Sequence, residues 1–297
     1  MEWLTDPFQV SFVARALWAG LLVSATCALA GTWVVLRGMA FLGDAMSHGM
    51  LPGVALASLL GGSLFAGGAL SAVVMALGVT AVTRWSRLSQ DTGIGLLFVW
   101  MLSLGVIIVS YSPSFAVDLT GFLFGDVLAV RPRDLAVLGG AAVCAAAVSL
   151  LGHRAFVALA FDPRKAATLG LRPRLAHAAM LGLVTLAVVA SFHVVGTLLV
   201  FGLLIAPPAA MALWARGIPA IMLGAAVLGS AATFTGLLAS WHLGTAAGAT
   251  VAAIAVALFF LSALAAGLRD CRPARAEQPS TPDAPDRAPK KEQEFTP

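Results

Sequence analysis

The hydrophobic pattern divides the chain into about nine apolar stretches with short polar breaks between them. A helix needs roughly 17–25 mostly apolar residues to cross a bilayer. In chain order the stretches are Phe12–Leu36, Met46–Leu60, Leu64–Val82, Thr92–Tyr111, Leu135–Leu151, Ala176–Phe192, Val194–Trp214, Ile218–Leu238 and Thr245–Leu268. The second is short and glycine-rich, and His193 alone separates the sixth from the seventh, so the pattern also fits eight spans. It predicts an all-α, polytopic membrane protein with about eight to nine transmembrane helices.

Composition supports the bilayer as the main solvent of this chain. Its 297 residues are 60% hydrophobic and 11% charged, whereas a soluble domain is nearer half apolar and a quarter charged. The net charge of +4 lies in short loops and indicates no nucleic-acid partner. The three cysteines are isolated, with neither metal-site spacing nor a disulfide framework.

Basic residues gather in alternate loops. With nine spans, one set of loops holds Arg37, Arg84, Arg87, Arg154, Arg164, Lys165, Arg172, Arg174 and Arg216. The opposite set holds Arg131 and Arg133, with Arg15 at the edge of the first span. The positive-inside rule then predicts an outside N-terminus and a cytoplasmic C-terminus. Arg131 and Arg133 are the exception, and they favour a re-entrant or extra short helix at Thr120–Val130.

The composition changes abruptly at Arg269. The remaining segment is rich in proline and charge and nearly free of large apolar residues. Such a segment buries too little surface to fold. We therefore expect a transmembrane domain of residues 1–268 and a disordered cytoplasmic tail of residues 269–297.

The sharpest local feature is the segment GDAMSH, residues 43–48, near the start of the second span. Residues four apart share a helix face, so Asp44 and His48 would offer a carboxylate and an imidazole to one cation. A charged Asp inside a membrane costs about 2.5–3.5 kcal/mol on insertion scales and usually has a function. Imidazole and carboxylate suit Zn²⁺ or Mn²⁺. Two ligands are too few for a tight site, but a two-fold homodimer with this span on its axis would supply four.

The same two residues also allow a structural interpretation. Asp44 follows a glycine and would serve as the N-cap of the second helix. His48 would then be an interfacial histidine bonded to backbone. Spacing alone does not decide between this interpretation and a metal site.

A polar, basic loop, Gly152–Arg174, separates the fifth and sixth spans. Asp162 and Pro163 are typical of a helix start, and Gly170 is typical of a residue just after a helix end. The pattern indicates a short helix outside the membrane, suited to docking a partner protein, although an ordinary basic loop fits as well. Further along, Pro207 and Pro208 would kink or end the seventh span.

Other polar residues give weaker indications. Ser47 and His193 are candidate waypoints for a metal, and His242 also falls on the predicted outer side. The sequence contains neither G-x-x-x-x-G-K-[ST] nor H-E-x-x-H. It therefore lacks a P-loop for ATP and the signature of a zinc-dependent protease.

Five segments together resemble the permease subunits of bacterial zinc/manganese/iron ABC importers. They are Trp33–Gly53, Asp91–Ser110, Leu119–Val130, Phe161–Pro173 and Val194–Ala210, in the order found in that family. One small departure is Gly38, where many members carry a second basic residue. The resemblance covers most of residues 10–265 and excludes the tail.

The resemblance implies a type II-like permease that is not itself an enzyme. Two copies would pair with two cytoplasmic ATPase subunits, and an extracytoplasmic binding protein would deliver the metal. Asp44 and His48 match residues believed to line the translocation path. The expected ATPase contact is the loop that carries Phe161, Asp162, Pro163, Arg164, Ala166, Leu169 and Gly170.

These observations predict a permease of the bacterial inner membrane that moves Zn²⁺ or Mn²⁺, with Fe²⁺ as a third candidate, by alternating access. No permanently bound cofactor is expected. Two other classes fit the hydrophobic pattern: an ion-coupled secondary transporter or channel, and a membrane protein of structure or assembly with no substrate. The sequence alone does not choose the metal.

Overall fold

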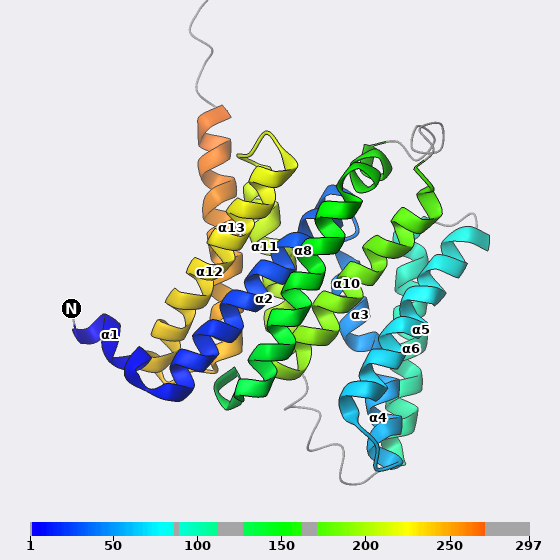
Figure 1. The fold of residues 1–297 in the computed structure, drawn as a ribbon, viewed down its shortest axis with the longest axis horizontal. Coiled ribbons are helices and arrows are strands. Elements are labelled where there is room, and N and C mark those ends of the chain that lie inside the picture. The colour runs from blue at the N-terminus through cyan, green and yellow to red at the C-terminus, as the bar shows by residue number, and fades with distance from the viewer. Residues whose placement is uncertain (1, 86–88, 112–126, 162–170, 271–297) are drawn as a thin grey trace, which may run out of the picture.

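The computed structural model describes the chain except for residues 1, 86–88, 112–126, 162–170 and 271–297. Its described helices are α1 (Glu2–Gln9), α2 (Ser11–Leu36), α3 (Phe41–Gly49), α4 (Leu51–Leu59), α5 (Leu64–Trp85), α6 (Gln90–Ser110), η1 (Val127–Ala129), α8 (Pro132–Phe161), α10 (Pro173–Val195), α11 (Thr197–Ala212), α12 (Ile218–Leu243) and α13 (Ala247–Asp270). All regular secondary structure in this described part is helical (Figure 1), so the all-α prediction is confirmed.

Seven of the described helices are long and apolar enough to cross a membrane. The other two predicted spans are present, but no single helix in them reaches the length of the seven. The seventh is α11, with 16 residues, and the second is divided into α3 and α4, with 9 residues each. The predicted number of eight to nine spans is therefore roughly right, but the second span is a broken helix.

The boundary between the sixth and seventh spans lies at Gly196. This glycine has φ +79°, a left-handed value that side chains rarely adopt, so α10 stops there and α11 begins at once. Pro207 and Pro208 do not end α11, which continues to Ala212. The two prolines therefore do not end the seventh span as expected. The sixth and seventh spans are separated by Gly196 instead.

Helix α2 runs through the middle of the bundle and contacts α8, α10, α11 and α12. Trp33 on α2 is completely buried, and its indole N–H donates to Ser149 Oγ over 3.1 Å. The Trp33 ring also meets the edge of Phe156, with ring centroids 5.2 Å apart. A bulky amphipathic ring buried in this way needs a partner for its N–H, and Ser149 of α8 provides it.

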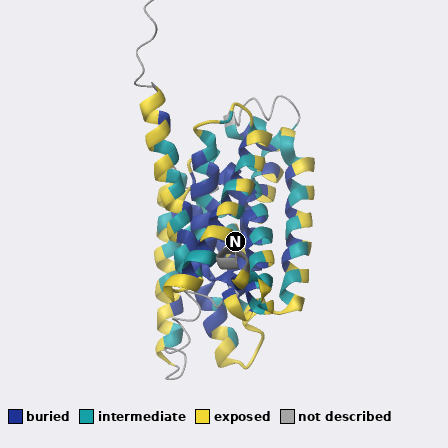
Figure 2. Ribbon diagram, turned by 90° about the vertical axis from the view of Figure 1, so that its left-hand side faces the viewer, coloured by how far each residue is buried: buried dark blue, intermediate teal, exposed yellow. Residues whose placement is uncertain are grey.

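The outer helices turn their apolar side chains outward. Figure 2 shows buried residues gathered toward the centre and exposed ones along the outer helices. The exposed large residues include Leu70 on α5, Trp100 on α6 and Leu151 on α8. An outward apolar surface of this kind matches a hydrocarbon environment, in agreement with the composition.

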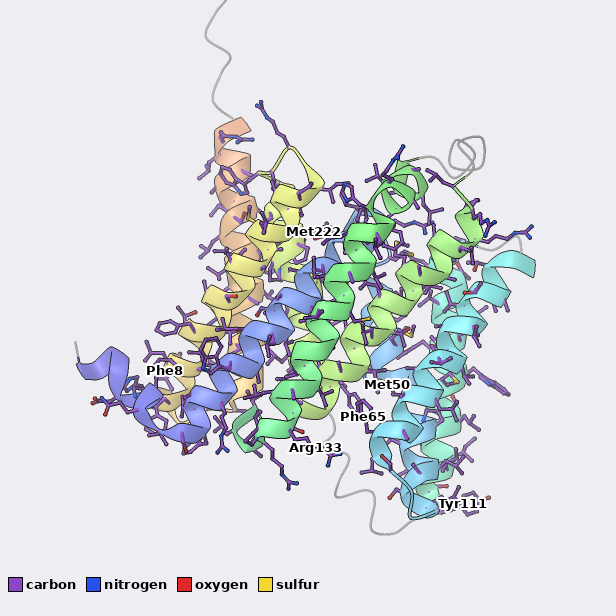
Figure 3. All side chains as sticks on the ribbon, in the orientation of Figure 1. Phe8, Met50, Phe65, Tyr111, Arg133 and Met222 are labelled. Carbon is purple, nitrogen blue, oxygen red and sulfur yellow. The ribbon has the colours of Figure 1, made fainter. Side chains whose placement is uncertain are left out.

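Arginines of the two loop sets lie at opposite ends of the bundle. Figure 3 places Phe8, Tyr111 and Arg133 toward one end, where Phe8 of α1 stacks on Phe234 of α12 with centroids 4.9 Å apart. The C-terminal end of α13, the α11–α12 loop and the start of α10 lie toward the other end (Figure 1). That second end carries Arg172 and Arg216, which belong to the basic loop set.

Candidate functional site

Asp44 and His48 lie one turn apart on α3, and their side chains meet. His48 Nε2 is 3.5 Å from Asp44 Oδ1. The helix begins at Phe41 with Ala40 as its N-cap, so Asp44 is inside the helix and does not cap it. The N-cap interpretation is therefore wrong. The side chain of Asp44 is 32% exposed and that of His48 is 26% exposed, so both are accessible on one face of α3.

An aromatic contact orients the imidazole. The His48 ring meets Phe98 of α6 edge-on, with centroids 5.7 Å apart and an interplanar angle of 74°. Phe98 in turn packs on Phe41 at the start of α3, with centroids 5.4 Å apart. The His48 ring is thus held between Asp44 and Phe98, and neither of these contacts is to backbone.

The opposite face of α3 is packed. Ala45 and Met46 have no exposed surface, and Ser47 is 1% exposed. The Ser47 hydroxyl donates to the Gly43 carbonyl over 3.0 Å, which places it away from the open Asp44–His48 face. His193 lies near the end of α10, and its side chain is outside the described residues.

The break after α3 is supported by a neighbouring helix. Pro52, near the start of α4, has no N–H to continue the helical hydrogen bonds. The Ser71 hydroxyl of α5 donates to the Gly49 carbonyl at the end of α3 over 2.7 Å. Gly53 and Gly67 also bring α4 and α5 together, because a Cβ on Gly53 would lie 2.1 Å from the Gly67 carbonyl oxygen. A broken helix at membrane depth is tolerated where neighbours satisfy its backbone in this way.

Replacing Ser71 with alanine is expected to destabilise the protein by about 1–3 kcal/mol, the cost of leaving a buried carbonyl without its hydroxyl partner. Thermal unfolding of the purified protein in detergent would measure the change. Ser110→Ala is the matched control, since the exposed Ser110 hydroxyl donates only to Ile107 of its own helix. Equal stability of the two variants would contradict this account of the break.

A single chain supplies two metal-type ligands at this place. Among the described residues, no three His, Cys, Asp or Glu side chains gather closely enough to hold a metal ion. Asp44 and His48 therefore form an open, incomplete pair of one oxygen and one nitrogen donor. Such a pair either binds a cation weakly or needs further ligands from outside the chain.

The predicted docking loop is only partly visible. Residues from Gly152 to Phe161 continue α8 as a helix, so the predicted start of the loop at Gly152 is wrong. Asp162, Pro163, Arg164, Ala166, Leu169 and Gly170 lie outside the described residues. The described part of the chain begins again at Leu171, and α10 begins at Pro173 with Arg172 as its N-cap. The predicted short helix and its docking function remain predictions.

Sequence reasoning missed the residues that support the site. Phe98 and Ser71 are separated from α3 by whole helices, and neither belongs to a motif with it. It also missed the contact of Arg37 with His177, which joins the end of α2 to the start of α10. No sequence signal marks these pairs, because their spacing in the chain has no periodic relation.

Residues 9–266 match the ABC 3 transport family. The chain belongs to this family. Two relatives show how far the similarity extends. "Manganese transport system membrane protein MntC" of Halalkalibacterium halodurans is 35% identical over 252 residues, covering 85% of this chain and 86% of the relative. "Probable iron transport system membrane protein" of Haemophilus influenzae is 33% identical over 267 residues, covering 89% and 97%.

A solved structure agrees with the family assignment. PsaBC from Streptococcus pneumoniae in complex with Fab matches with a TM-score of 0.76 and 30% sequence identity, over 87% of this chain and 94% of that chain. The resemblance to metal-ion ABC permeases inferred from five sequence segments is thereby confirmed at the level of the ABC 3 family. The family assignment also confirms a multi-pass membrane permease.

Proposed function

We propose that this ABC 3 family chain is the membrane-spanning subunit of an ATP-driven importer of a divalent metal ion. The observation that carries the proposal is the open Asp44–His48 pair on α3, with Nε2 and Oδ1 3.5 Å apart. Carboxylate with imidazole suits Mn²⁺, Fe²⁺ and Zn²⁺. The relatives that are named for manganese and for iron favour the first two metals.

The pair acts as a transient site for the ion. The side chains of Asp44 and His48 are 32% and 26% exposed, so an ion can reach both donors. They can then replace part of the hydration shell of the ion. A site with few ligands releases its ion readily, which transport requires. Ser47 and His193 remain candidate waypoints, although the Ser47 hydroxyl is committed to the Gly43 carbonyl.

A second copy of the chain completes the site. In a two-fold homodimer with α3 near its axis, two Asp44 and two His48 side chains give four donors. The exposed fractions of the pair support this arrangement, since a bare carboxylate facing lipid is costly. Distances between cysteines introduced on the α3 helices of the two copies, measured by crosslinking, would test it.

The energy for transport comes from a partner protein. ATP hydrolysis takes place on a separate cytoplasmic ATPase subunit that docks at Phe161–Gly170, and an extracytoplasmic protein delivers the metal. The end of the bundle that carries Arg172 and Arg216 then faces the cytoplasm, with the N-terminus outside and the C-terminal end of α13, at Asp270, inside. Membership of the ABC 3 family supports this arrangement over an ion-coupled transporter or channel.

Uptake by reconstituted vesicles tests the proposal. The chain, its ATPase and its binding protein are placed in proteoliposomes, and entry of radioactive manganese, iron and zinc is followed with ATP, without ATP and with a non-hydrolysable analogue. Uptake that requires hydrolysis supports the proposal. Equal uptake without ATP would favour an ion-coupled transporter or channel and contradict it.

A further inference from the structure

A polar contact joins two helix ends that are far apart in the sequence. Arg37 follows the last residue of α2, and its Nη1 lies 3.0 Å from Nδ1 of His177. His177 lies in the second turn of α10, which begins at Pro173. The guanidinium has donors and no acceptor. His177 Nδ1 must therefore be the acceptor, which requires a neutral imidazole with its proton on Nε2.

The contact is partly shielded from solvent. Both residues are half-buried, and burial lowers the pKa of Arg37 from its ordinary value. An arginine nevertheless remains charged in a protein. A hydrogen bond from a charged donor is stronger than a neutral one, and more so where water is partly excluded. The Arg37–His177 contact is thus a firm link between α2 and α10.

The α2 end of this link leads directly to the candidate metal pair. Gly38, with φ +65°, turns the chain sharply after Arg37, and α3 begins at Phe41. Asp44 follows within the first turn of α3. A helix is stiff along its axis and rises about 1.5 Å per residue. A displacement of the Arg37 turn therefore moves Asp44 with it.

The turn between α2 and α3 is also held from a second side. Met39 is buried, and its Sδ lies 2.8 Å from Nε2 of Gln90, the first residue of α6. Helix α6 further contacts the pair through Phe98 on His48. The turn therefore contacts both α6 and α10, so a displacement of either helix acts on it.

We propose that Arg37 and His177 are positioning residues that transmit movement of α10 to the metal pair on α3. This inference rests on the proposed function, because it takes the segment just before α10 as the contact with the ATPase. When the ATPase shifts the start of α10, the His177 link carries the shift to the α2–α3 turn, and α3 changes the position of Asp44 and His48. The link does not touch the metal.

The test measures both metal uptake and ATP hydrolysis, and their ratio gives the coupling between the two. In proteoliposomes with the ATPase and binding protein, His177→Ala is expected to lower the number of manganese ions imported per ATP hydrolysed by about tenfold, the size of one charge-assisted hydrogen bond. The KM for manganese is expected to stay within about twofold, because the ligands are intact. His177→Asn should restore most of the coupling, since its amide oxygen offers an acceptor near the position of Nδ1.

Three further variants complete the test. Leu175→Ala removes an exposed side chain two residues earlier on α10 and should leave the ratio unchanged. Arg37→Met should match His177→Ala, and the double variant should be no worse than either, because both remove one contact. An unchanged ratio in His177→Ala, including a parallel fall in uptake and hydrolysis, would overturn the inference. Absence of ATP-dependent uptake in the wild type would instead contradict the proposed function.

Discussion

Asp44→Asn is expected to lower ATP-dependent metal uptake by about a hundredfold or more. Loss of a residue that merely supports a metal ligand costs about 10–100-fold, so loss of a ligand itself should reach at least the upper value. Asparagine keeps the size of the side chain and removes its negative charge, so α3 should pack unchanged. Initial uptake rates in proteoliposomes, normalised to the amount of reconstituted protein, measure the effect.

Asp91→Asn provides the matched control for this change. Asp91 is an exposed carboxylate in the first turn of α6, and removal of its charge weakens only a favourable helix-terminus interaction of at most about 1 kcal/mol. Its uptake should stay within about twofold of wild type. If Asp44→Asn transports as fast as Asp91→Asn, then Asp44 is not a ligand on the path and the proposed metal pair is wrong.

Gly31→Ala is expected to be the most damaging small substitution in the core. A Cβ at Gly31 would lie 1.8 Å from the carbonyl oxygen of Leu204 and 2.8 Å from the carbonyl carbon of the same residue. Both are backbone atoms, so α2 and α11 would have to separate along the centre of the bundle. Overpacking costs about 1–3 kcal/mol and sometimes more. We expect a loss near 3 kcal/mol, which lowers the Tm on the order of 5–10 °C.

Gly140→Ala separates this packing effect from the general effect of replacing a helical glycine. A Cβ at Gly140 on α8 meets no atom within 4 Å. Alanine is the better helix former by about 0.5–1 kcal/mol, so this variant should be neutral or slightly more stable. Thermal unfolding of both proteins in the same detergent compares them. Similar Tm values would show that α2 and α11 are not packed as closely as described.

The apolar periods of the chain were sufficient to predict most of its helices. Stretches such as Phe12–Leu36 and Ile218–Leu238 fall within α2 and α12, because only a helix satisfies its own backbone in a bilayer. The spacing of Asp44 and His48 likewise predicted that their side chains would share one helix face, since a four-residue separation is about one helical turn, and the structure shows them 3.5 Å apart.

The spacing of residues along the chain did not predict features that depend on contacts with a second helix. Met46–Leu60 reads as one short span, yet the chain breaks into α3 and α4 because Ser71 and the Gly53–Gly67 contact support the break. His48 is fixed by Phe98 of α6, and Arg37 by His177 of α10. In each case the partner is far away in the chain.

The sequence by itself determined the class of the protein, the positions of most of its spans and the placement of a carboxylate and an imidazole one helical turn apart. All three depend on interactions within a few residues or on hydrophobicity along a helix. The tertiary structure decided which face of α3 stays open, how its break is supported and which helix ends are linked. Those features depend on contacts between distant segments, and a periodic pattern along one helix carries no information about which other helix will pack against it.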